Sequence, residues 1–212
     1  MYFAIEGVIG VGKTTLARRL QPSFQSNLLM EVFEENPFLS NFYADRARYA
    51  FQTQIFFLLS RYHQQNSNVP GLISGGQHLI SDYTFEKDAL FASINLQGDE
   101  LTMYYRVHEA LAEKIPAPDL VVYLRASTAT LMQRIAMRDR PYERQMDPDY
   151  IDLVNQAYDK AFLDENRRVP VLVLDANQID FVRHPDDLAW VENRIRQSLL
   201  LPPFQPELPI SG

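Results

Sequence analysis

One eight-residue segment near the N-terminus, Gly7 to Thr14, limits the possible folds more than any other feature of the sequence. It matches the P-loop pattern G-x-x-x-x-G-K-[ST] at every fixed position, and it lies between an apolar run and a helical pattern. The glycines let backbone N–H groups converge on phosphate oxygens, and the following helix turns its positive end toward the same anion. The sequence therefore predicts a nucleoside triphosphate site at the first strand-to-helix turn of an α/β domain.

The side chains of the P-loop have separate predicted roles. We expect Lys13 to reach the β- and γ-phosphates as a point charge and the Thr14 hydroxyl to complete a Mg²⁺ shell. The other residues of the loop that we expect to contact ATP are Gly7, Gly10, Val11, Gly12 and Thr15. A chance match would not need to fall between a strand and a helix, so nucleotide binding follows from the motif and its place. The motif does not identify the group that accepts the phosphate.

The composition is that of an ordinary globular chain. Of the 212 residues 46% are hydrophobic and 22% charged, which suits one α/β domain over residues 1–200 with an irregular Pro-rich tail at 201–212. The net charge of −7 argues against binding a nucleic acid polymer, and the lack of cysteine excludes disulfides and thiolate metal sites. A strand at Met1 to Ile5 would leave no room for a signal peptide, and Ile55 to Leu59 is far too short to span a membrane. We therefore expect a cytoplasmic protein without membrane contact.

Apolar runs alternate with helical patterns, which predicts a P-loop kinase fold: a five-stranded parallel sheet with helices on both faces. Strands are expected at 2–6, 27–32, 78–82, 120–124 and 169–174. Helices are expected at 13–20, at 38–65 as two helices meeting near 43–49, and at 84–95, 99–114, 127–137, 150–167 and 186–200. Ser127 is a good N-cap. The segment 71–76 reads as a Gly-rich linker, and 138–147 as a short Arg-rich loop.

Acidic residues follow two of the predicted strands. Glu31 lies at or near the end of the second strand, with Glu34, Glu35 and Asn36 just beyond it, and Asp82 ends the third strand. Ligands bind at the carboxyl ends of parallel strands, so these carboxylates could face the site, and Asp82 would suit a metal or a phosphoryl acceptor. Taken singly, Glu34 and Glu35 could be solvated loop charges, and Asp82 could be a helix N-cap.

A group of arginines precedes and enters the predicted loop at 138–147. Arg134, Arg138 and Arg140 lie near Glu143, and clustered guanidinium groups there could neutralise charge on a transferring phosphate. Arginines at a helix end could equally complement the helix dipole. Together with the P-loop and the two acids, they favour a small-molecule kinase over a GTPase or a motor ATPase.

The order of these motifs resembles the deoxynucleoside kinase family, and specifically its bacterial deoxyadenosine/deoxyguanosine kinase branch, over about residues 1–200. The resemblance rests on the P-loop, E-V-F-E-E-N-P at 31–37, F-Q-T-Q at 51–54 with S-R at 60–61, S-D-Y at 81–83, and R-I-A-M-R-D-R-P-Y-E at 134–143. It implies ATP- and Mg²⁺-dependent phosphorylation of the 5′-hydroxyl of deoxyadenosine or deoxyguanosine, in nucleotide salvage.

The resemblance also implies roles for residues on the acceptor side. Glu31 looks like the general base that takes the proton from the 5′-hydroxyl. Gln54 matches the glutamine that hydrogen-bonds the nucleobase, and Arg61 matches a base-side arginine. Tyr43 and Glu143 match the pair that holds the sugar 3′-hydroxyl.

On the phosphate side the resemblance is less complete. Asp82 matches the acid that helps organise Mg²⁺, and the arginines of a lid at about 138–147 would close over the phosphates. These lid-type arginines are Arg134, Arg138 and Arg140. Many members of the family have an arginine directly after the acid, where this chain has Tyr83. Either another arginine supplies that cation, which would normally pair with the base or the 5′-oxygen, or Tyr83 donates a hydrogen bond instead.

The preferred nucleobase stays open at this point. The position that discriminates between bases could be Lys87 or Asp88, because the spacing after Asp82 differs by one residue from some members. Phe91 is a weak candidate for stacking on the base, since aromatic residues at helical spacing usually pack in the core.

Two other functions also stay open. A nucleoside monophosphate kinase of the thymidylate kinase type shares the P-loop and the lid, but it needs cations where this chain has the Glu31 carboxylate. A non-catalytic kinase-like subunit would be expected to lose Lys13 and Thr14. The resemblance further implies a homodimer, for which the helices around Phe56 and Val107 offer candidate surfaces, and feedback inhibition by a deoxynucleoside triphosphate.

Overall fold

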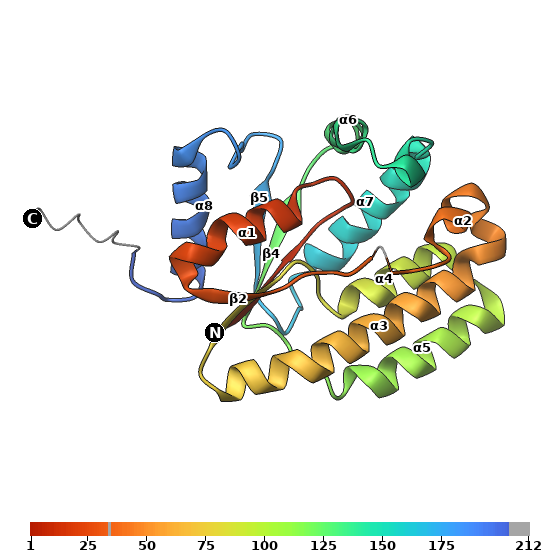
Figure 1. Ribbon diagram of the computed structural model, residues 1–212, viewed down its shortest axis with the longest axis horizontal. Coiled ribbons are helices and arrows are strands. Elements are labelled where there is room, and N and C mark those ends of the chain that lie inside the picture. Colours follow the sequence, from red (N-terminus) through yellow and green to blue (C-terminus); the bar gives the residue numbers. More distant parts are fainter. Residues whose placement is uncertain (34, 204–212) are drawn as a thin grey trace, which may run out of the picture.

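Five parallel strands form the centre of the structure, a computed structural model that describes residues 1–33 and 35–203 (Figure 1). The strands are β1 (Tyr2–Glu6), β2 (Ser26–Leu29), β3 (His78–Ser81), β4 (Leu120–Arg125) and β5 (Val171–Asp175). Their order across the sheet is β2-β3-β1-β4-β5. Every neighbouring pair is parallel, so the predicted five-stranded parallel sheet is confirmed.

Helices cover both faces of this sheet, as expected. They are α1 (Lys13–Phe24), α2 (Leu39–Ala44), α3 (Arg46–Ser74), α4 (Glu86–Asn95), α5 (Gly98–Ala112), α6 (Thr128–Arg138), α7 (Pro148–Phe162) and α8 (Pro185–Ser198). Helices α1 and α8 lie on one side of the sheet, and α3, α4, α5 and α7 lie on the other (Figure 1). The amino end of α1 and the short helix α2 both lie toward the edge of the sheet at which the strands end (Figure 1).

The central strands are continuous apolar runs because both of their faces are buried. Phe3 and Ile5 of β1 are fully buried. Tyr123 of β4 stacks on Tyr158 and Phe162 of α7, with ring centroids 6.1 and 5.4 Å apart. This packing holds the carboxyl ends of β1 and β4 in a fixed position, at which the P-loop begins.

Two side-chain caps explain where helices begin. The backbone N–H of Thr130 donates to Ser127 Oγ at 3.2 Å, which confirms the predicted N-cap of α6. Asp45 separates α2 from α3, and its Oδ1 accepts from the backbone N–H of Arg48 at 3.2 Å. The predicted break near residues 43–49 is thus produced by a capping aspartate.

The prediction of a Gly-rich linker at 71–76 is wrong. Helix α3 continues through Gly71 to Ser74, and the backbone N–H of Gly75 donates to the carbonyl of Gly71 at 3.1 Å. A glycine in a helix costs only about 1 kcal/mol relative to alanine, which the packing of a long helix can offset. The turn is made by Gly76, whose φ of 70° is left-handed.

Two other predicted boundaries are also corrected. The second strand ends at Leu29, so Glu31 lies in the loop beyond the strand. Helix α7 ends at Phe162, five residues before the predicted end at Arg167. The Arg167 Nη1 donates to the carbonyl of Ala161 at 2.8 Å and so caps the helix from outside it.

The predicted loop at 138–147 contains more regular structure than expected. Arg138 is the last residue of α6, and Pro141–Glu143 form a 3₁₀ turn, η1. Residues 201–203 of the predicted tail have no regular structure, while Glu34 and residues 204–212 lie outside the described residues. None of the described helices combines the length and the apolar character needed to cross a membrane.

Candidate active site

The P-loop connects β1 to α1 in a conformation that requires glycine. Gly7 has a φ of +147°, and a Cβ there would lie 2.5 Å from the carbonyl oxygen of Leu124. Lys13 folds over the loop, and its Nζ donates to the carbonyls of Gly7 at 2.7 Å and Val8 at 3.3 Å. Burial, followed by the nearby charge of Lys87, lowers the pKa of the Lys13 ammonium to about 8. The N–H donors of Lys13 thus go to backbone carbonyls of the loop itself.

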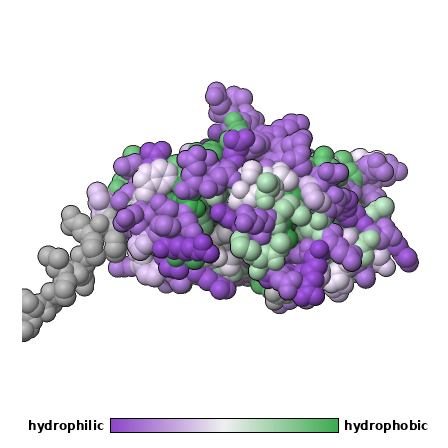
Figure 2. Space-filling view, turned by 90° about the horizontal axis from the view of Figure 1, so that it is seen from above, coloured by the Kyte–Doolittle hydropathy of each residue, from purple (hydrophilic) through white to green (hydrophobic). Residues whose placement is uncertain are grey.

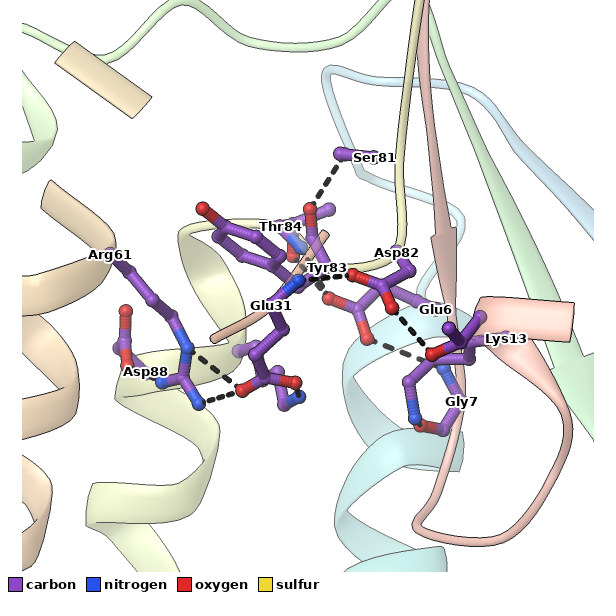
Figure 3. Close-up of polar contacts among 12 residues, drawn as sticks. Glu6, Gly7, Lys13, Glu31, Arg61, Ser81, Asp82, Tyr83, Thr84 and Asp88 are labelled. Carbon is purple, nitrogen blue, oxygen red and sulfur yellow. Dashed lines mark hydrogen bonds and ion pairs between the residues drawn. The ribbon is translucent and has the colours of Figure 1, made fainter. Parts of the chain in front are cut away.

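Asp82 links the P-loop to the acidic loop after β2 (Figure 3). Its Oδ2 accepts from the Thr14 hydroxyl at 2.6 Å, and its Oδ1 accepts from the backbone N–H of Glu31 at 2.7 Å. A hydroxyl and a carboxylate side by side are oxygen ligands of the kind Mg²⁺ uses when substrate phosphates and water supply the others. Within the described residues, no group of three or more acidic or histidine side chains could hold a metal by itself.

The carboxylate of Glu31 is held between two cations. Lys87 Nζ lies 2.6 Å from its Oε2, and the Arg61 guanidinium contacts its Oε1, with Nε at 3.1 Å. Arg61 also pairs with the fully buried Asp88. Burial alone would raise the pKa of Glu31, but the charges of Lys87 and Arg61 outweigh burial and hold that pKa well below its ordinary value.

Glu6, the last residue of β1, holds the first residue of the P-loop in place through hydrogen bonds. Its carboxylate accepts from the backbone N–H of Thr84 at 2.5 Å and its hydroxyl at 2.9 Å, from the Tyr158 hydroxyl at 3.1 Å, and from the backbone N–H of Gly7 at 3.3 Å. Burial raises the pKa of this carboxyl. The side chain ties the end of β1 to the segment that follows Asp82, which fixes the phosphate loop relative to the acidic residues.

A pocket opens beside Glu31 and encloses about 820 Å³, including the solvent at its mouth. The residues expected on the acceptor side that line it are Glu31, Tyr43, Gln54, Arg61, Asp82 and Glu143. Asp88 does not line it and lies behind Arg61. Gln54 is buried, and its Oε1 has no hydrogen-bond partner among residues 1–33 and 35–203, so it is able to accept a hydrogen bond from a ligand.

The arginines at the end of α6 and just after it face the phosphate side. A second cavity is lined by the P-loop together with Arg18, Arg134, Arg138 and Arg140. Arg138 contacts Glu143 through Nη2 at 2.6 Å, and the Arg140 guanidinium lies 4.2 Å from the ring centroid of Phe33. Arg138 and Arg140 line both cavities.

Arg134 is placed differently from the other two arginines. It donates to the carbonyls of Val11 at 3.0 Å and Ala176 at 2.8 Å, which braces the P-loop against the segment after β5. In this structure Arg134 therefore supports the P-loop through its hydrogen bonds to the backbone.

Tyr83, which stands where an arginine is common in the family that the motifs resemble, does not reach Glu31 directly. Its hydroxyl donates to Gln64 Oε1 at 2.5 Å, and Gln64 Nε2 donates to the carbonyl of Met30 at 2.8 Å. Tyr83 therefore supports the backbone next to Glu31, while the charges on the carboxylate come from Arg61 and Lys87.

The contact of Lys87 with Glu31 was missed by sequence reasoning, which considered Lys87 only as a base-discriminating residue. One signal could have found it. Lys87 stands in the first turn of α4, between Glu86 and Asp88, and a cation there opposes the helix dipole. A buried lysine in that place needs an anionic partner. Arg18 and Phe33 carried no comparable signal.

Known proteins resemble this chain in sequence and in fold. A family model described as deoxynucleoside kinase matches residues 3–200. A deoxyguanosine kinase of Bacillus subtilis (strain 168) is 32% identical, covering 94% of this chain and 98% of the relative. A deoxyadenosine kinase of Dictyostelium discoideum is 31% identical, covering 89% and 76%. A solved structure of the M. mycoides deoxyadenosine kinase, with dCMP and a flexible dCDP bound, has a TM-score of 0.80 at 25% identity and covers 93% of this chain and all of that one.

Proposed function

Because this chain belongs to the deoxynucleoside kinase family, we propose that it transfers the γ-phosphoryl group of ATP to the 5′-hydroxyl of deoxyadenosine or deoxyguanosine. One observation carries the proposal: the ionised carboxylate of Glu31 stands between the phosphate cavity and the acceptor pocket. The names of the relatives, which are deoxyguanosine and deoxyadenosine kinases, support a purine acceptor.

In the proposed reaction the P-loop binds the triphosphate through its backbone N–H groups. Lys13 exchanges its contacts with the loop carbonyls for the phosphate oxygens. Thr14 and Asp82 would hold Mg²⁺, which would neutralise charge on the β- and γ-phosphates. Arg138 and Arg140, from a lid at about 138–147, lie where they can neutralise charge on the transferring group.

Glu31 acts as the general base of this reaction. The 5′-oxygen forms a bond to the γ-phosphorus, its proton passes to the Glu31 carboxylate, and the bond to the β-phosphate oxygen breaks to release ADP. A base in this role contributes roughly 10²–10⁴-fold to the rate. The low pKa of Glu31 keeps the carboxylate ionised, so an acceptor site for the proton is free when the nucleoside binds.

The acceptor pocket would bind both the sugar and the base of the nucleoside. Glu143 belongs to the lid, Tyr43 stacks on Tyr142 of the lid, and both would bind the sugar 3′-hydroxyl. Gln54 and Arg61 would bind the nucleobase, with the buried Asp88 fixing the guanidinium of Arg61. The face at which the strands end is mostly hydrophilic, with scattered apolar side chains, as suits a polar ligand that enters from solvent (Figure 2).

The test is a labelling assay with purified protein, Mg²⁺ and γ-labelled ATP. Each of the four deoxynucleosides and each of their monophosphates is supplied separately. We expect label on deoxyadenosine, deoxyguanosine or both. Label on no deoxynucleoside would refute the proposal, and label on a monophosphate alone would instead support a nucleoside monophosphate kinase. Absence of label on all eight compounds would support a non-catalytic subunit.

A homodimer is a second part of the proposal. Leu59 on α3 and Met103 and Val107 on α5 are exposed apolar side chains on helices that pack against each other. Such a surface is suited to a second copy of the chain. Light scattering coupled to size exclusion would give twice the chain mass of 24.5 kDa if the proposal holds.

A further inference from the structure

The loop after β2 presents one carboxylate to two cations that differ in what else they contact. The guanidinium of Arg61 is shared between Glu31 and Asp88, so one anion besides Glu31 already balances its charge. The ammonium of Lys87 contacts Glu31 Oε2 at 2.6 Å and makes no second hydrogen bond within the described residues. An ammonium has three N–H donors, so two donors of Lys87 are left for other partners.

The surroundings of Lys87 show which groups these donors can reach. The side chain is 7% exposed, and it lines the acceptor pocket together with Glu31 and Lys13. Its charge also acts on the P-loop, because after burial it is the main cause that lowers the pKa of Lys13. Lys87 therefore stands at the border between the acceptor carboxylate and the phosphate loop.

We propose that Lys87 is a positioning residue of the reaction, which fixes the ionised Glu31 carboxylate and turns a positive charge toward the oxygen that attacks the phosphorus. The inference rests on the proposed function. Without this cation, Glu31 would keep only Arg61, whose charge is shared with Asp88, and its Oε2 would lose its partner. Tyr83 cannot take this role, because its hydroxyl donates to Gln64.

The chain contains no cysteine, which permits a test by chemical replacement of the side chain. In Lys87→Cys the new thiol is the only one in the protein. Alkylation with 2-bromoethylamine restores an ammonium at nearly the length of lysine, whereas alkylation with iodoacetamide gives a neutral side chain of similar size. The matched control is Lys114→Cys, at an exposed position, treated in the same two ways.

We expect kcat of Lys87→Cys to fall by roughly 10²-fold, as when one charge-stabilising donor is removed from an active site. The ammonium-bearing product should recover to within about tenfold of the unmodified enzyme, and the neutral product should not. KM for ATP should change little, because the P-loop remains intact. Equal kcat for the two alkylated forms, or an unchanged kcat in Lys87→Cys, would overturn the proposal.

A second measurement separates this inference from the proposed function. If the unmodified protein phosphorylates a deoxynucleoside and the alkylated forms do not differ, only the role of Lys87 fails. If the unmodified protein labels no deoxynucleoside, the pairing is tested by thermal unfolding of Lys87→Met, Glu31→Gln and the double variant. Shifts in Tm that simply add would refute the Lys87–Glu31 pairing, and non-additive shifts would retain it.

Discussion

The phosphate end and the acceptor end of this site are built in different ways. The phosphate end is built around consecutive residues, 7–14, whose backbone groups and helix terminus line the cavity together with nearby arginines. The acceptor end consists of side chains from separate elements: Glu31 after β2, Arg61 on α3, and Lys87 and Asp88 on α4. One end therefore depends on backbone conformation, and the other depends on balancing two buried carboxylates with two cations.

Glu31→Gln gives the largest effect expected at the acceptor end. The amide keeps the shape of the side chain but cannot accept the proton, so kcat should fall by about 10²–10⁴-fold. Affinity for ATP should stay within about threefold, because no P-loop atom changes. Steady-state kinetics and calorimetric titration with ATP measure the two quantities.

The matched control for this variant is Glu109→Gln, at an exposed position on α5. It should match the unmodified protein in both measurements. If Glu31→Gln weakened ATP binding as much as it lowered kcat, the two ends would not be separable in the way their construction suggests.

Gly7→Ala tests the phosphate end by changing backbone freedom without changing charge. The added Cβ would meet the Leu124 carbonyl and Val11 Cγ1, the latter at 2.9 Å, and the φ of +147° is strained for alanine. We expect a loss of about 1–3 kcal/mol in the free energy of unfolding. Denaturant unfolding followed by circular dichroism measures it.

Gly71→Ala should change the free energy of unfolding in the opposite direction to Gly7→Ala. Gly71 lies within α3, and its added Cβ would meet nothing within 4 Å. Alanine there should stabilise the protein by about 0.5–1 kcal/mol. A stable Gly7→Ala protein with normal ATP affinity would show that the loop does not depend on its glycine conformation.

The same difference between the two ends explains what could be predicted from the sequence. The P-loop is a local motif, so Lys13 and Thr14 were placed from the pattern alone. The strands were placed because buried parallel strands are continuous apolar runs. The contact of Lys87 with Glu31 joins α4 to the loop after β2 across 56 residues, and no spacing rule connects two such positions.

The wrong helix boundaries have a related cause. Gly71 suggested a linker, but the α3 packing that overrides its weak helix propensity is visible only in the fold. The helical pattern from Tyr150 was expected to run to Arg167, but α7 ends at Phe162. In the structure the arginine serves that end from outside, through its bond to the Ala161 carbonyl.

Lys13 should take up a proton when the phosphate end binds ATP. Its pKa of about 8 should rise toward the ordinary value when phosphate oxygens replace the loop carbonyls. At pH 8 about half of the lysine is neutral, so we expect roughly half a proton taken up for each ATP bound. Without ATP, the folded protein binds fewer protons than the unfolded chain above pH 8, so stability from this group rises with pH in that range.

Calorimetric titrations with ATP at pH 8 in two buffers of unlike ionisation enthalpy measure the uptake. Lys13→Met is the control and should show none. The uptake should vanish near pH 6.5, where the lysine is already charged. Proton release at pH 8 would mean that the pKa of Lys13 falls on binding, contrary to the geometry.

Tyr83→Phe should give the smallest effect, because Tyr83 acts on the acceptor end only through Gln64 and the Met30 carbonyl. Removing the hydroxyl leaves Gln64 Oε1 without its donor and should cost about 0.5–1.5 kcal/mol of unfolding free energy. With both cations still on Glu31, kcat should fall by less than about tenfold. The control is Tyr105→Phe, whose hydroxyl makes no hydrogen bond within the described residues. A loss in kcat as large as that of Glu31→Gln would mean that the backbone support of Glu31 matters as much as its charge partners, and that the acceptor end depends on backbone position as strongly as the phosphate end does.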